Sequence, residues 1–206
     1  MPLVPLPARL GVLLSGRGSN FEAIADACER GELPARIVAV ISDREEAAGL
    51  RRAEERTLPT FSVAGDAFVG RRAREARILE ILSETGVDLI CLAGFMRLLS
   101  PEFVERFPLR ILNVHPSLLP SFPGRDAHGQ ALRSGVRVTG ATVHFVDAGT
   151  DSGPIVGQAA VPILPDDDAG SLSARILPVE HRLYVDAVRR ILAGGWSVDG
   201  RVVRFS

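Results

Sequence analysis

The stretch Leu10-Gly-Val-Leu-Leu-Ser-Gly-Arg-Gly-Ser-Asn20 decides the fold of this chain of 206 residues. It begins as a short apolar run, passes through a glycine-rich turn and enters a helix-like segment from Asn20 to Arg30. A continuous apolar run is typical of a strand buried on both faces, as in a parallel sheet covered by helices. The stretch therefore predicts the first strand–turn–helix unit of an α/β fold.

The same alternation continues along the first half of the chain. Apolar runs at 36–42, 60–63, 87–93 and 110–114 predict strands, and the segments 45–56 and 71–84 predict helices. No repeat, low-complexity tract or linker interrupts the pattern. We therefore expect one domain over 1–206, a Rossmann-like three-layer α/β sandwich with a mostly parallel central sheet.

After residue 114 the pattern changes, and an antiparallel C-terminal portion is expected. A proline-rich loop leads to a short helix near 128–134 and to two longer strands at 136–147 and 154–163, the second with Pro162 at an edge or a strand end. A last helix at 171–192 tolerates Pro178 only if it starts late or kinks there. Asp199-Gly200 predicts a terminal hairpin over 197–205.

Composition excludes several classes of function. The formal net charge is −1, which argues against a nucleic-acid partner, and lysine is absent, which excludes a Schiff-base or Walker-type lysine. The two cysteines, Cys28 and Cys91, are too few for a disulfide framework or a zinc cluster, so we expect no metal. No apolar run reaches the ~18 residues of a membrane span, and Met1–Arg9 lacks the pattern of a signal peptide. We expect a cytoplasmic protein without a membrane partner.

The first turn, Ser15-Gly-Arg-Gly-Ser-Asn20, can bind a phosphate on the free N–H groups of the helix that follows. The alternative is that Ser19 or Asn20 merely caps that helix. A dinucleotide fingerprint would need a third glycine at 21, where the chain has Phe21, so a monophosphate on Gly18, Ser19 and Asn20 fits better. Arg17 adds a charged contact or is a solvated loop residue.

Asn113-Val-His115-Pro contains one of only two asparagines in the chain. An amide and an imidazole at the end of an apolar strand could stabilise an oxyanion and move a proton, although a strand end before a proline turn is the simpler interpretation. Asp151, in a glycine-flanked turn, could orient His115. Since no serine or cysteine stands out as a nucleophile, direct attack by a substrate amine suits these residues. We interpret His144 as a strand residue that is packed or hydrogen-bonded in place.

Four ordered motifs resemble the phosphoribosylglycinamide formyltransferases of purine synthesis. They are Ser15–Asn20, Leu92-Ala-Gly-Phe-Met-Arg97, Asn113-Val-His-Pro-Ser-Leu-Leu-Pro120, and His144-Phe-Val followed by Asp151-Ser-Gly-Pro154. The resemblance extends from Leu10 to about Val188. It implies transfer of a formyl group from 10-formyltetrahydrofolate, a co-substrate, to the amine of glycinamide ribonucleotide.

The resemblance also implies roles for individual residues. Asn113, His115 and Asp151 match the catalytic trio, while Gly18, Ser19, Asn20 and Glu180 match the residues that bind glycinamide ribonucleotide. The residues on the folate side are Arg71, Met96, Arg97, Leu98, Leu99, Asn113 and Asp147. Residues 1–110 would thus form a nucleotide-phosphate-binding half and residues 111–206 a catalytic and folate-binding half. The partners would be small molecules, with a homodimer left open.

Two positions depart from the family pattern, and three alternative functions stay open. Arg17 replaces a smaller residue, and Asp126 stands where a histidine often occurs. A methionyl-tRNA formyltransferase or a formyltetrahydrofolate hydrolase shares the Asn-x-His-Pro core, but the first is expected to have a basic surface and an extra C-terminal domain, and the second a regulatory domain. A non-catalytic nucleotide-binding module would not need Asn113, His115 and Asp151 together.

Overall fold

The apolar run that opens the chain forms β1 (Ala8–Leu14), in which every residue except Arg9 is buried. In the computed structural model, residues 5–65, 68 and 70–206 are described. The first four residues of the Met1–Arg9 segment, for which no signal-peptide pattern was expected, lie outside the described residues. β1 is flanked on both sides by parallel strands, which explains why its apolar run does not alternate.

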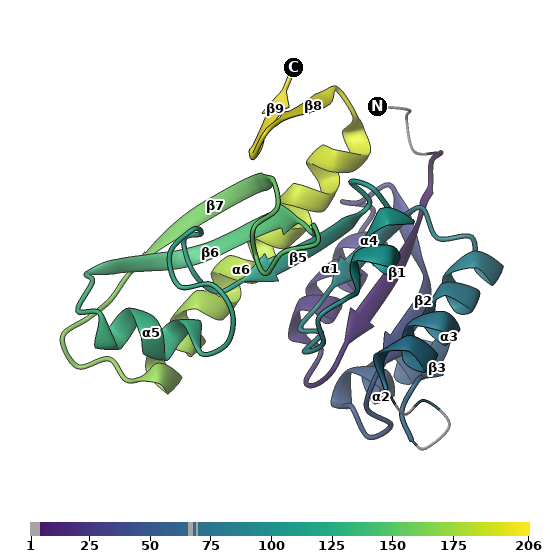
Figure 1. Ribbon diagram of the computed structural model, residues 1–206, viewed down its shortest axis with the longest axis horizontal. Coiled ribbons are helices and arrows are strands. Elements are labelled where there is room, and N and C mark those ends of the chain that lie inside the picture. The colour runs from purple at the N-terminus through teal and green to yellow at the C-terminus, as the bar shows by residue number, and fades with distance from the viewer. Residues whose placement is uncertain (1–4, 66–67, 69) are drawn as a thin grey trace.

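The described residues form one mixed sheet of nine strands in the order β3-β2-β1-β4-β5-β6-β7-β9-β8 (Figure 1). The strands after β1 are β2 (Ala35–Ser42), β3 (Thr60–Ser62), β4 (Leu89–Leu92), β5 (Ile111–His115), β6 (Val138–Phe145), β7 (Ile155–Pro162), β8 (Trp196–Asp199) and β9 (Val202–Phe205). The neighbouring strands β3, β2, β1, β4 and β5 are parallel to one another. β6 is antiparallel to both of its neighbours, β5 and β7. The predicted mostly parallel sheet with an antiparallel C-terminal portion is confirmed.

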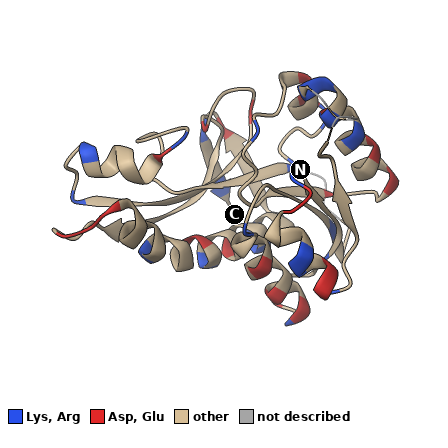
Figure 2. Ribbon diagram, turned by 90° about the horizontal axis from the view of Figure 1, so that it is seen from below, with Lys and Arg blue, Asp and Glu red and all other residues tan. Residues whose placement is uncertain are grey.

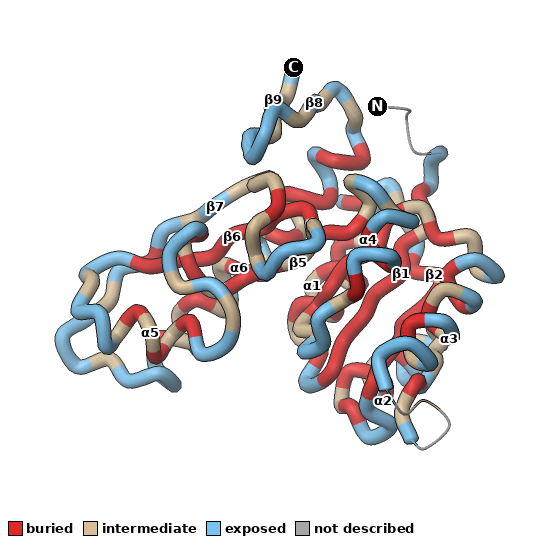
Figure 3. Tube along the Cα trace, in the orientation of Figure 1, coloured by how far each residue is buried: buried red, intermediate tan, exposed pale blue. Residues whose placement is uncertain are grey.

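Helices cover both faces of the sheet and complete the predicted three layers. On one face, α1 (Ser19–Glu29), α2 (Ala48–Glu55) and α6 (Ala169–Ala193) share a core cluster with the strands. On the other, α3 (Arg71–Glu84) and α4 (Pro101–Glu105) pack in a second cluster. The short α5 (Ala127–Arg133) packs near the antiparallel end, where Leu132 joins a third cluster. Buried segments run through the central strands, and β7 is more exposed (Figure 3).

Two helices differ from the sequence prediction. α4 was not predicted, because a five-residue helix is too short to show a periodic pattern; Ser100 caps it and Pro101 starts it. α6 begins at Ala169, earlier than expected, and Pro178 lies inside it. An Asp168–Ser171 capping box fixes its start. The fully buried Leu172 and Ile176 hold the turns before the proline, so packing outweighs the lost backbone hydrogen bond.

The remaining expectations about the fold concern Pro162, the terminal hairpin and Cys91. Pro162 is the last residue of β7, and β8 and β9 form the predicted hairpin. Cys91 is fully buried, and burial raises the pKa of its thiol to about 12, so it is an inert packing residue.

Charged residues of both signs are distributed over the helices, while most strands carry few (Figure 2). This mixed distribution agrees with the nearly neutral composition. Among the described residues, no helix has the length and apolar character needed to cross a membrane.

Tyr184 of α6 ties the helix layer to the strands that support the carboxyl edge of the sheet. Its side chain is fully buried, and its hydroxyl lies 2.9 Å from the Leu112 carbonyl oxygen and 3.2 Å from that of Leu92. One hydroxyl hydrogen can serve only one of these acceptors fully. The contact therefore joins α6 to the last residue of β4 and to β5.

We predict that Tyr184→Phe lowers the free energy of unfolding by about 1–2 kcal/mol, because a buried carbonyl loses its donor while the ring packing is kept. Urea unfolding followed by circular dichroism measures the change. An unchanged transition midpoint would show that the hydroxyl contributes nothing to docking α6.

Candidate active site

β1, β4 and β5 are parallel, so their carboxyl ends meet at one edge of the sheet. The strand order reverses direction between β1 and β4, which is where open α/β sheets form ligand crevices. The two loops that follow are joined at this point: the Ser15 N–H donates to the Gly94 carbonyl at 3.1 Å, and the Met96 N–H donates to Ser15 Oγ at 2.8 Å. The turn after β1 and the loop after β4 thus form one rim.

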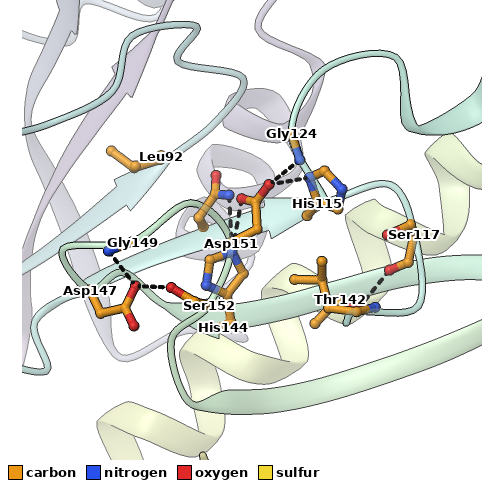
Figure 4. Close-up of polar contacts among 12 residues, drawn as sticks. Leu92, His115, Ser117, Gly124, Thr142, His144, Asp147, Gly149, Asp151 and Ser152 are labelled. Atoms are coloured by element: carbon orange, nitrogen blue, oxygen red, sulfur yellow. Dashed lines mark hydrogen bonds and ion pairs between the residues drawn. The ribbon is translucent and has the colours of Figure 1, made fainter. Parts of the chain in front are cut away.

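Asn113 and His115 lie on β5 and point to the same side of the sheet, since they are two residues apart. Asp151 reaches them from the loop between β6 and β7, with its Oδ2 3.3 Å from His115 Nδ1 (Figure 4). The Gly124 N–H donates to the same Oδ2 at 2.8 Å. The structure therefore brings the predicted trio together, while its catalytic role stays a prediction.

His144 is a buried residue of β6 that is hydrogen-bonded in place, as expected, and its ring also joins this cluster. β5 and β6 pair Asn113 with His144 directly, and Asn113 Nδ2 lies 3.2 Å from His144 Nε2. His144 Nε2 is also 3.6 Å from Asp151 Oδ1. Antiparallel pairing of the strand at 136–147 with β5 was the signal that could have found His144, because it sets polar residues of both strands side by side.

The hydrogen positions on the two rings follow from their acceptors. His115 Nε2 lies 2.8 Å from the Phe122 carbonyl oxygen, which can only accept, so this nitrogen carries hydrogen. Donation to both Phe122 and Asp151 needs two N–H groups, which only the imidazolium carries. His144 Nδ1 donates to the Phe145 carbonyl at 2.8 Å, and its Nε2 faces both the Asn113 amide nitrogen at 3.2 Å and Asp151 Oδ1 at 3.6 Å. One N–H of the Asn113 amide then stays available for another acceptor.

The environment of Asp151 favours its ionised form. Burial alone would raise its pKa, but the His144 ring, the Gly124 N–H and the positive charge that His115 can carry outweigh burial and leave the pKa below its ordinary value. Asp151 has a positive φ of 53°, a conformation that aspartate tolerates better than most residues. A charged carboxylate is thus held between two imidazoles.

The glycine-rich turn after β1 leads directly into α1 and depends on the conformation of Gly18. Gly18 precedes α1 with a φ of 78°, and a Cβ placed there would lie 2.6 Å from the Cα of Gly49. Only glycine fits this position. α1 has no side-chain cap, so the interpretation of Ser19 or Asn20 as a capping residue is wrong.

Asn20 instead contacts α6. Its Nδ2 donates to Glu180 Oε2 at 2.8 Å, and both residues are buried. Burial raises the pKa of Glu180, although the Asn20 hydrogen bond and the charge of Arg17 partly offset this. Asn20 Oδ1 is buried and has no hydrogen-bond partner in the part of the chain that the structure describes. A polar group of this kind fits a ligand contact at the turn.

Most residues expected on the folate side line one cavity of about 190 Å³ beside Asn113 and Asp151. Its predicted members are Arg71, Arg97, Leu98, Leu99, Asn113 and Asp147, and Leu92, Phe95 and Val146 add apolar walls. Met96 does not line it: its side chain is 61% exposed on the rim. A larger hollow of about 560 Å³ between α1 and α6 includes Ser19 but none of the trio.

Three acidic side chains around the site, Asp147, Asp43 and Asp126, hold loops or a helix start in place. Asp147 accepts hydrogen bonds from the Gly149 N–H and the Ser152 hydroxyl. Asp43, which follows β2, accepts from Arg97 Nε at 2.6 Å. Asp126 caps α5 by accepting from the Gly129 N–H at 3.2 Å, which gives this departure from the family pattern a structural role. Among the described residues, no group of three or more His, Cys, Asp or Glu side chains is arranged to hold a metal ion.

The family model for formyl transferases matches residues 8–188. A phosphoribosylglycinamide formyltransferase of Mycobacterium tuberculosis is 48% identical over 195 residues, which are 95% of this chain and 90% of that protein. The crystal structure of glycinamide ribonucleotide transformylase 1 from Symbiobacterium toebii is 49% identical with a TM-score of 0.93, covering 96% of this chain and 93% of that one.

Two further likenesses differ in coverage. A formyltetrahydrofolate deformylase from Pseudomonas syringae is 26% identical with a TM-score of 0.88, covering 97% of this chain but 66% of that one. The chain also spans a fifth or less of the trifunctional purine biosynthetic protein adenosine-3 of Bos taurus, Drosophila melanogaster and Homo sapiens.

The chain belongs to the formyl transferase family. A phosphoribosylglycinamide formyltransferase and a glycinamide ribonucleotide transformylase match the chain over at least 90% of both lengths.

We predict that the stability difference between the wild-type protein and Asp151→Asn depends on pH. The folded-state pKa of Asp151 is below its unfolded value, so its ionised form stabilises the fold above that unfolded value, and the contribution is lost as pH falls toward the folded pKa. Urea unfolding at about pH 7, 5 and 3 should show the difference shrinking toward the acid end. A constant difference would mean that Asp151 is not held ionised by its neighbours.

Proposed function

We propose that the protein transfers a formyl group from 10-formyltetrahydrofolate to the amine of glycinamide ribonucleotide in purine biosynthesis. The observation that supports this most directly is the ionised Asp151 between His115 and His144, next to the Asn113 amide. The glycine-rich turn and a cavity with both charged and apolar walls flank this cluster on the same edge of the sheet. Two substrates could therefore meet at the cluster.

Glycinamide ribonucleotide would bind on the side of the glycine-rich turn. Its phosphate would rest on the N–H groups of Gly18, Ser19 and Asn20 at the start of α1. Glu180, held by Asn20 at 2.8 Å, would accept hydrogen bonds from the nucleotide. Arg17 is exposed on the turn, and its positive charge partly offsets the rise that burial causes in the pKa of Glu180. Its guanidinium can therefore attract the phosphate.

The folate would bind on the other side. Leu92, Phe95 and Val146 offer apolar walls for a ring system, and Arg71 and Arg97 offer positive charge for carboxylates. The cavity of about 190 Å³ is below the usual size of a ligand pocket, roughly 300–1,000 Å³, so it would hold one end of an elongated ligand. The rest would lie along the exposed side chains of Met96 and Leu98.

Asn113, His115 and Asp151 would each have a separate role in the formyl transfer. Asn113 donates its second N–H to the oxygen of the formyl group as the amine attacks, and protonated His115 stabilises the same developing negative charge. His115 can reach that oxygen only after its Nε2–H leaves the Phe122 carbonyl. Asp151 stabilises the imidazolium and assists transfer of a proton from the amine to the folate nitrogen. Alignment of the two substrates contributes alongside this chemistry.

The two halves of the chain would cooperate at both binding sites. Glu180 belongs to 111–206 but contacts the phosphate turn, and Arg71 and Arg97 belong to 1–110 but line the folate cavity. We propose a single formyltransferase domain whose halves 1–110 and 111–206 each contribute to both sites. We further propose that it acts in the cytoplasm on small molecules, without metal, nucleic acid or membrane; a homodimer is compatible with this scheme.

Hydrolysis of 10-formyltetrahydrofolate is the alternative that shares most of the same residues. The 26% identity to a formyltetrahydrofolate deformylase motivates the comparison, whereas the phosphate turn favours a phosphorylated amine. We predict that tetrahydrofolate, followed spectrophotometrically, forms only when glycinamide ribonucleotide is present. Equal formation without the nucleotide would support hydrolysis instead.

Replacement of Asp151 tests the catalytic role of the cluster. We predict that Asp151→Asn lowers kcat by roughly 10²-fold or more, because the imidazolium loses its counter-charge and the amine its proton acceptor. Binding of both substrates, measured by calorimetry, should persist. Near-normal turnover of a variant that binds both substrates would contradict the assignment, and a non-catalytic nucleotide-binding module would show binding without turnover in the wild-type protein as well.

Replacement of Glu180 tests the nucleotide side. Glu180→Gln keeps an acceptor for Asn20 but removes the carboxylate, so KM for glycinamide ribonucleotide should rise roughly tenfold or more while KM for the folate changes little. Glu22→Gln, in the first turn of α1 and paired with Arg52, is the matched control and should leave both values unchanged. An equal rise in both KM values would place Glu180 outside the nucleotide site.

A further inference from the structure

His115 is the first member of a row of three polar residues across the antiparallel part of the sheet. β5 pairs His115 with Thr142 of β6, and β6 pairs Thr142 with Gln158 of β7. Residues paired directly across neighbouring strands project to the same face. The row therefore connects the catalytic cluster to a strand that contributes none of the predicted site residues.

The Thr142 hydroxyl uses its full hydrogen-bonding capacity on the loop that follows β5. It donates to the Ser117 carbonyl at 2.6 Å and accepts from the Leu119 N–H at 3.0 Å and from Gln158 Nε2 at 3.0 Å. A hydroxyl has one hydrogen and two lone pairs, so no capacity is left over. Thr142 is fully buried, which makes each of these bonds costly to lose.

Gln158 completes the support from β7. Its Nε2 also donates to the Leu119 carbonyl at 2.8 Å, so its two N–H groups serve Leu119 and Thr142. Leu119 is thus held at both its N–H and its carbonyl. Gln158 is exposed to solvent, so its contribution should be smaller than that of the buried Thr142.

The supported loop carries the groups that hold the catalytic pair. Ser117, fully buried, donates its hydroxyl to the Ser121 carbonyl at 2.5 Å, close to the Phe122 carbonyl at 3.4 Å. Phe122 is the acceptor of His115 Nε2, and Gly124 is the donor to Asp151. A shift of the backbone at 117–119 would therefore move both partners of the His115–Asp151 pair (Figure 4).

We propose that Thr142 and Gln158 are positioning residues for the reaction: they fix the loop at 117–124 so that His115 and Asp151 keep their mutual geometry. The proposal rests on the proposed formyl transfer for its kinetic consequence, but the link from Thr142 to His115 is independent of it. Misplacement of a catalytic group by as little as 1 Å can cost roughly 10²-fold in rate.

The test compares Thr142→Val, which keeps the shape but removes the hydroxyl, with Thr142→Ser, which keeps the hydroxyl. We expect kcat to fall roughly tenfold or more in Thr142→Val, with the dissociation constant for glycinamide ribonucleotide within about twofold of wild type. The kcat of Thr142→Ser should lie within about threefold of the wild-type value, and Gln158→Leu should lower kcat less than Thr142→Val does. Thr139→Val is the matched control on the same strand, since the buried Thr139 hydroxyl has no partner among the described residues.

A second readout needs no substrate. In ¹⁵N–¹H spectra, the His115 Nε2–H signal, assigned by its loss in His115→Asn, should exchange with solvent about tenfold faster or more in Thr142→Val than in the wild type or Thr139→Val. Unchanged exchange, or wild-type kcat in Thr142→Val, would overturn the proposal, as would a loss that Thr142→Ser does not recover. If the wild type fails to transfer formyl groups but the exchange rates differ as expected, the proposed function fails while the positioning role stands.

Discussion

The antiparallel pairing of β5 with β6 is the constraint on which the site depends. It sets Asn113 opposite His144 and His115 opposite Thr142, so the two strands present four polar side chains to one face. The intervening Val114 and Val143 point into the core shared with α1 and α6. Because the side-chain period of a strand is two, a register slip by one residue would bury the polar set and expose the apolar one. The core thus enforces the geometry of the site.

The parallel half adds the other requirement, an edge with room for ligands. The strand order reverses between β1 and β4, and the turn at Gly18 and the loop at Met96 form the rim at their carboxyl ends. Neither half of the sheet could form the candidate site alone. The glycine-rich turn follows a parallel strand, whereas the titratable cluster lies on and beside the antiparallel pair β5 and β6. The fold joins them in one sheet.

The sequence was sufficient for the order of elements other than α4, the mixed sheet and the clustering of Asn113, His115 and Asp151, because these depend on local apolar runs and on ordered motifs. It was not sufficient for His144, whose position depends on strand pairing, or for Asn20, which resembles a helix cap until α6 packs beside it. The early start of α6 depends on the packing of Leu172 and Ile176, a tertiary effect that a local rule about proline does not include. Met96 shares a motif with cavity residues, but its side chain direction could not be read from spacing.

The bond between Asn20 and Glu180 joins residues 160 positions apart in the chain. Contacts of such sequence separation form late in folding, because the entropy of closing the long intervening loop must be overcome first. The nucleotide side would therefore be complete only after α6 has docked against α1, whatever the state of the glycine-rich turn. Affinity for the nucleotide would then measure whether α6 has docked. Added nucleotide should selectively stabilise chains that have finished folding.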